Sequence, residues 1–114
     1  MQAWLPAHRG VDLRAHTRQR VLAPGPGTIV FTGRIADRPV VVMRWRGVRL
    51  TFEPVRAVRS VGAAVDRGEV IGRVGTGGHC GSTCLHWGAK VDGTYVDPLS
   101  FLPRERPVLK PFHP

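Results

Sequence analysis

The chain has 114 residues, enough for one domain with a modest hydrophobic core. Its 14 glycines and 10 prolines favour short strands and turns over long helices, and no apolar stretch reaches the length of a membrane-spanning helix. The 17 Lys and Arg against 8 Asp and Glu give a net charge of +9, which attracts polyanions. The basic residues are scattered and match no DNA- or RNA-binding motif, so we expect no nucleic-acid partner.

The first half of the chain contains strand signals separated by turns. Residues 21–24 and 27–33 are two short β-rich runs with prolines and glycines between them. Residues 39–46 form a longer strand candidate, and residues 48–53 alternate apolar and polar side chains with period two. Together the last two runs predict a hairpin that turns near Arg46-Gly47.

The second half continues the pattern. Residues 61–74 are turn-rich and carry one or two strands, and residues 84–91 form another strand. Asp92-Gly93 is a strong hairpin signal that joins this strand to residues 94–96. Strands at intervals of about 8–12 residues indicate an all-β fold, either a two-sheet sandwich or a distorted barrel.

The compact domain is expected to cover residues 1–102 and to end with one helical turn within residues 97–102. Residues 103–114 hold four prolines and are interpreted as a Pro-rich C-terminal tail.

Two segments carry residues that bind metals. His8 and Asp12 lie four positions apart with a glycine between them, and an imidazole nitrogen and a carboxylate oxygen are standard zinc ligands. His86 lies on a predicted strand, where Leu85 and Trp87 point to the opposite, core-facing side. A histidine in this position either is a metal ligand or is a half-buried histidine with an ordinary hydrogen-bond partner.

Taken together, these segments resemble the lysostaphin-type (LytM-like) zinc metallopeptidases over about residues 8 to 102. The matching pieces are His8-x-Gly-x-Asp12, Ala23 to Gly33, Val65 to Gly72, Leu85-His86-Trp87 and Thr94 to Leu99. The resemblance implies a zinc groove with His8, Asp12 and His86 as the three protein ligands. It also implies hydrolysis of peptide bonds in bacterial peptidoglycan, with zinc polarising the scissile carbonyl and activating water.

The sequence departs from the family pattern at two places. The family uses two histidines that bind no metal and assist the reaction, and Pro54 and Cys84 stand at those positions. Proline transfers no proton, and losing a general acid or base typically costs a factor of about 10²–10⁴ in rate.

Three residues are considered as substitutes. Glu53 could act as a base, and His79 precedes the site strand in a glycine-containing loop; each could equally be an ordinary strand or loop residue. A reduced Cys84 could be a fourth zinc ligand and close the site. We expect instead a disulfide between Cys80 and Cys84, because the two are close in sequence and the family acts outside the cell.

Three functions remain in competition: a zinc endopeptidase acting on peptidoglycan, a zinc-retaining domain that binds wall polymer or regulates another hydrolase, and a polyanion-binding module whose site is vestigial. The expected partner is peptidoglycan or another anionic wall polymer, and the expected state is a monomer. The resemblance implies an extracellular or cell-wall location, although the chain begins without a signal peptide. We therefore expect a piece of a longer precursor or a start codon assigned too late.

Overall fold

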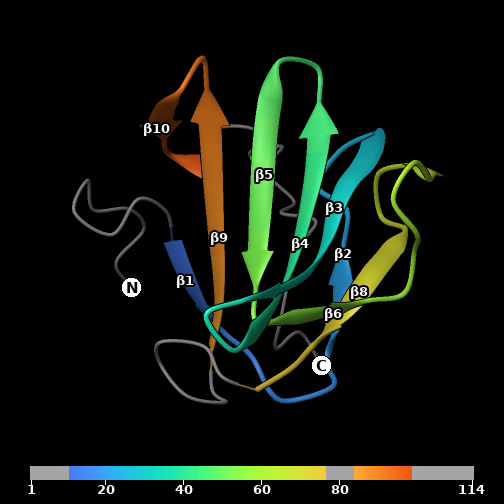
Figure 1. Ribbon diagram of the computed structural model, residues 1–114, viewed down its shortest axis with the longest axis vertical. Helices are drawn as coiled ribbons and strands as arrows, with labels where there is room; N and C mark the ends of the chain where they lie inside the picture. The colour runs from blue at the N-terminus through green and yellow to red at the C-terminus, as the bar shows by residue number, and fades with distance from the viewer. Residues whose placement is uncertain (1–10, 77–83, 99–114) are drawn as a thin grey trace.

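A computed structural model describes residues 11–76 and 84–98 of the chain (Figure 1). These residues form ten strands: β1 (Val11–Arg14), β2 (Arg20–Leu22), β3 (Gly27–Ile35), β4 (Arg38–Trp45), β5 (Val48–Glu53), β6 (Val55–Ala57), β7 (Ala64–Val65), β8 (Val70–Val74), β9 (Cys84–Val91) and β10 (Thr94–Val96). In this part of the chain no helix is long and apolar enough to cross a membrane.

The strands form two antiparallel sheets. The larger has seven strands in the order β1-β9-β5-β4-β3-β7, and β10 pairs with β9 on the same side as β1, beyond the end of β1. The smaller has the order β2-β8-β6. Figure 1 shows β9, β5 and β4 standing side by side, with β6 and β8 at one end of this sheet. The predicted all-β, two-sheet architecture is confirmed.

Hairpin turns explain much of this order. The predicted turns at Arg46-Gly47 and Asp92-Gly93 join β4 to β5 and β9 to β10. Asp92 and Gly93 have φ angles of 49° and 78°, as a two-residue type I′ turn requires. The hairpin between β3 and β4 turns at Ala36-Asp37 with φ angles of 51° and 68°, although no glycine stands there. That turn was not predicted, because Ala36 is unusual at positive φ and Ala36-Asp37 lacks the glycine of a typical hairpin turn.

The core lies between the sheets and depends on alternation along β5 and β9. Phe52 and Trp87 are fully buried, and their rings stack with centroids 6.1 Å apart. Leu50 and Leu85 are buried on the same side, whereas His86 between Leu85 and Trp87 points to the opposite face. The predicted core role of Trp87 is confirmed.

Replacing Trp87 by alanine is expected to lower the free energy of unfolding by about 3–5 kcal/mol, because it removes a fully buried ring and its stacking on Phe52. Denaturant titration measures this change. Val61→Ala, at a side chain with 58% exposure, is the control and should change the free energy by less than about 0.5 kcal/mol. Similar losses in both variants would contradict the core placement.

Candidate functional site

Three acidic or histidine side chains line up across three neighbouring strands. Asp12 on β1 lies opposite His86 on β9, and His86 lies opposite Glu53 on β5. Directly opposite residues on one face of an antiparallel sheet have Cβ atoms about 4.5–5.5 Å apart. The strand register therefore brings together residues separated by more than thirty positions in the sequence.

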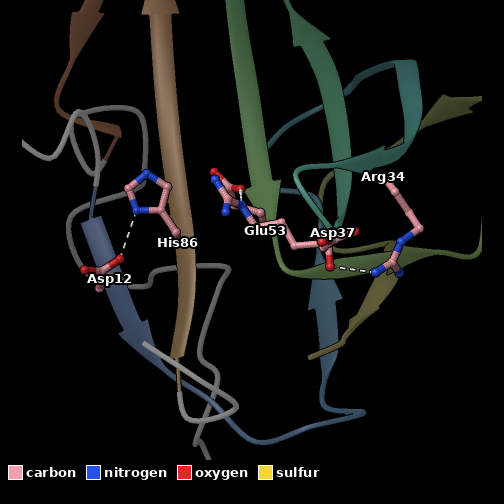
Figure 2. A network of polar contacts seen from close by, with 6 residues as sticks. Asp12, Arg34, Asp37, Glu53 and His86 are labelled. Carbon is pink, nitrogen blue, oxygen red and sulfur yellow. Dashed lines mark hydrogen bonds and ion pairs between the residues drawn. The ribbon is translucent and has the colours of Figure 1, made fainter. Parts of the chain in front are cut away.

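The closest of these contacts joins Asp12 and His86. His86 Nδ1 and Asp12 Oδ1 are 2.9 Å apart, and Figure 2 shows the imidazole of β9 facing the carboxylate of β1. The side chain of His86 is 12% exposed and that of Asp12 is 34% exposed. An ionised carboxylate only accepts hydrogen bonds, so in this pair the ring N–H donates.

Glu53, on the other side of His86, forms an ion pair. Arg38 Nε on β4 donates to Glu53 Oε1, with the two side chains 31% and 18% exposed. Oε2 of Glu53 has no hydrogen-bond partner among the described residues. The ion pair therefore fixes one oxygen of the carboxylate and leaves the other available.

A groove of about 290 Å³ opens on this face of the large sheet. It is lined by Arg49, Thr51, Glu53, His86, Gly88, Ala89, Lys90 and Tyr95. His86 and Glu53 lie toward one end of it, and β10 contributes Tyr95 at the other end. No motif in the sequence indicates Arg49, Lys90 or Tyr95. Period-two alternation along the hairpin strands nevertheless places their side chains on the same face as Glu53 and His86.

The remaining predicted site residues have different outcomes. His8, His79, Cys80 and the tail 103–114 lie outside the described residues. Cys84 is at the start of β9 and only 8% exposed. Its predicted bond to Cys80 stays a prediction. Within residues 11–76 and 84–98, no three His, Cys, Asp or Glu side chains gather closely enough to hold a metal ion. The described part of the expected zinc site thus consists of two of its three ligands.

Pro54, at one of the substituted helper positions, is buried and has a structural role. Its carbonyl accepts a hydrogen bond from Gly75 N at 2.8 Å, which connects the β5–β6 junction to the end of β8. A residue in this place supports the joint between the two sheets and supplies no proton-transfer group.

Comparison with protein families agrees with this geometry. The model of peptidase family M23 matches residues 6–98. The chain belongs to peptidase family M23. The resemblance to lysostaphin-type enzymes proposed from the sequence motifs is thereby confirmed.

Relatives with similar sequences are longer than this chain. An uncharacterised protein of Mycobacterium tuberculosis is 44% identical over 115 residues, which cover 95% of this chain and 46% of that protein. The DD-carboxypeptidase/endopeptidase Mpg of Neisseria meningitidis is 33% identical over 95 residues, covering 82% of this chain and 22% of the enzyme. The chain therefore spans about half or less of the length of these relatives.

Solved structures of other family members have the same fold. The catalytic domain of the antimicrobial peptidase lysostaphin from Staphylococcus simulans superimposes with a TM-score of 0.74 at 25% identity, over 82% of this chain and 77% of that domain. Csd3 of Helicobacter pylori superimposes with a TM-score of 0.72 at 27% identity, over 83% of this chain and 26% of Csd3.

The contact between Asp12 and His86 is expected to contribute about 0.5–1.5 kcal/mol to stability in the presence of a chelator. A double-mutant cycle with Asp12→Ala and His86→Ala, read out by denaturant unfolding, measures this coupling. A second cycle pairs Asp12→Ala with His16→Ala, at an exposed histidine, and should be additive within about 0.5 kcal/mol. Additivity in the first cycle as well would contradict the contact.

Proposed function

We propose that this domain hydrolyses peptide bonds in bacterial peptidoglycan with a zinc ion held by His8, Asp12 and His86. The observation that carries the proposal is the pairing of His86 with Asp12, 2.9 Å apart, beside a groove on the outer face of the sheet. Membership of peptidase family M23 and the likeness to the lysostaphin catalytic domain and to Mpg support the same chemistry.

The described donors suit zinc. Asp12 offers a carboxylate oxygen and His86 an imidazole nitrogen, both partly exposed. Their 2.9 Å separation is slightly less than the roughly 3.3 Å between two ligands of a tetrahedral zinc ion with bonds of about 2.0–2.1 Å. A small widening of the pair, with the ring proton carried on Nε2 instead of Nδ1, would free Nδ1 of His86 for the ion. With His8, the set would be two histidines and one aspartate, and the fourth zinc position would remain open.

The chain's own residues supply positioning and proton transfer. The groove along β9 holds the peptide extended, and zinc, when bound, polarises the scissile carbonyl and acidifies the attacking water. Glu53 faces the reaction from the strand next to His86 and receives the proton at Oε2. Arg38, bound to Oε1, keeps that carboxylate in place. His79 is a second candidate for the same role.

The second candidate function is a domain that retains zinc and binds the wall polymer or regulates another hydrolase without cutting. It is favoured by the buried Pro54 and Cys84 at the helper positions and by the engagement of Glu53 with Arg38. Both candidate functions keep the metal, so zinc content does not distinguish them. Cleavage of peptidoglycan does. In either case the substrate lies outside the membrane, and we propose that the domain acts at the cell wall as a monomer.

Protein purified without chelator is expected to contain about one zinc per chain, and His86→Ala is expected to lose it, because the variant removes one of three protein ligands. The matched control is His16→Ala, which removes an exposed histidine outside the groove and should keep the metal. Elemental analysis of the three proteins measures this. Zinc bound equally in all three would refute the assignment.

The same proteins are then incubated with purified peptidoglycan, and the release of soluble fragments is followed. Cleavage that a chelator abolishes and added zinc restores supports the endopeptidase; zinc without cleavage supports the binding domain. If cleavage occurs, Glu53→Gln should lower kcat by about 10²–10⁴, because it keeps the shape but cannot accept the proton. An unchanged kcat would remove Glu53 from the mechanism.

Titration of the unfolded, non-reduced protein with a thiol reagent is expected to find no free thiol, because Cys80 and Cys84 are proposed to form a disulfide. After reduction, two thiols per chain should react, in line with the two cysteines of the sequence. Two reactive thiols before reduction would overturn the disulfide and make Cys84 available as a zinc ligand.

A further inference from the structure

Three basic side chains form a row across the end of the groove farther from His86. Arg44 on β4 lies opposite Arg49 on β5, and Arg49 lies opposite Lys90 on β9. Lys90 lies in turn opposite Tyr95 on β10. Two of the three bases, Arg49 and Lys90, line the groove together with Tyr95.

Such a row is unfavourable for the fold by itself. Like charges directly opposite one another in a sheet repel and lower its stability. Within residues 11–76 and 84–98, none of the three bases has an acidic partner at ion-pair distance, in contrast to Arg38 and Arg59, which each pair with a glutamate. No described carboxylate offsets the repulsion within the row, and an external anion would relieve it.

The side chains are also placed to meet a ligand. The Lys90 ammonium lies 4.8 Å from the centroid of the Tyr95 ring, a cation–π contact that orients the ammonium at the wall of the groove. The ring covers one side of the ammonium, and the N–H donors on the other side remain available to a ligand. Arg49, which is exposed beside it, adds a planar fork suited to a carboxylate.

The row lies at a defined distance from the proposed reaction centre. Lys90 follows His86 by four residues on the same strand and the same face, about 13 Å away at the usual rise of a strand. Between them Gly88 and Thr51 lie opposite each other in the groove lining, and Gly88 has no side chain that would obstruct the path. An extended peptide covers the same distance in about four residues.

We propose that Arg49 and Lys90, supported by Arg44, form a subsite for a carboxylate of the substrate peptide about three to four residues from the bond that is cut. This inference rests on the proposed function and adds a specificity determinant to it. The subsite selects peptides whose carboxyl group is free over peptides in which the same group is an amide.

The test uses two substrates: soluble peptidoglycan fragments that have free carboxyl groups, and the same fragments after those groups have been converted to amides. Wild type is expected to cleave the free acid with a kcat/KM about tenfold higher, mainly through a lower KM, as expected for one charge-assisted contact. Arg49→Gln and Lys90→Gln should each abolish most of this preference. The matched control is Arg67→Gln, which removes one positive charge from an exposed turn outside the groove and should keep the preference.

Binding is measured in parallel by calorimetry with His86→Ala, so that the subsite is tested without turnover. If the His86→Ala protein binds the free acid more tightly than the amide, and adding Arg49→Gln removes this difference, the subsite is supported. This result holds even if wild type proves inactive and the proposed hydrolysis fails. Equal binding of acid and amide overturns the subsite. Equal losses of affinity for the free acid in Arg49→Gln and Arg67→Gln also overturn it and indicate diffuse charge attraction. Thermal unfolding midpoints of the glutamine variants should be unchanged or higher, since repulsion within the row is relieved; lower midpoints would indicate a structural role.

Discussion

The pairing of β9 with β1 and β5 is the constraint on which the rest of the molecule depends. Side chains of a strand alternate between faces, so Leu85, Trp87 and Ala89 enter the core while His86, Gly88 and Lys90 face the groove. A shift of one residue in register would exchange these sets and expose the Trp87 ring to water. The energy of burying the core thus also fixes the face and the height at which His86 meets Asp12 and Glu53.

Much of this arrangement was accessible from the sequence. The period-two pattern and the two glycine-containing turns predicted the β4–β5 and β9–β10 hairpins, and the alternation around His86 placed it opposite the core. The sequence did not predict β1 and β6, because such short strands give no periodic signal. It also did not predict the turn at Ala36-Asp37, because its residues are unusual for a hairpin turn. Which strands become neighbours depends on long-range pairing. The motif residues alone therefore could not show that Glu53 lies opposite His86.

The site differs from the family pattern in how its acid–base groups are provided. The side chain of Pro54 has no proton-transfer group, and Cys84 is buried at the start of β9 and does not line the groove. Glu53 is the remaining acidic group in the groove lining. Its ion pair with Arg38 holds one carboxylate oxygen in place and restricts the motion of the side chain. As the proposed base, Glu53 would be held in position but would be less adaptable than a free histidine.

The two ends of the groove differ in whether their charged side chains have partners of opposite charge. At the His86 end each charged group has a partner: Asp12 contacts His86, and Glu53 contacts Arg38. At the Tyr95 end Arg49 and Lys90 share a wall without a described carboxylate between them, so the electrostatic potential rises along the groove in that direction. An extended peptide carrying one carboxylate would gain most by lying with that group toward Tyr95. The charge distribution therefore gives the groove a direction, and a direction determines which of several similar bonds in a peptide reaches His86.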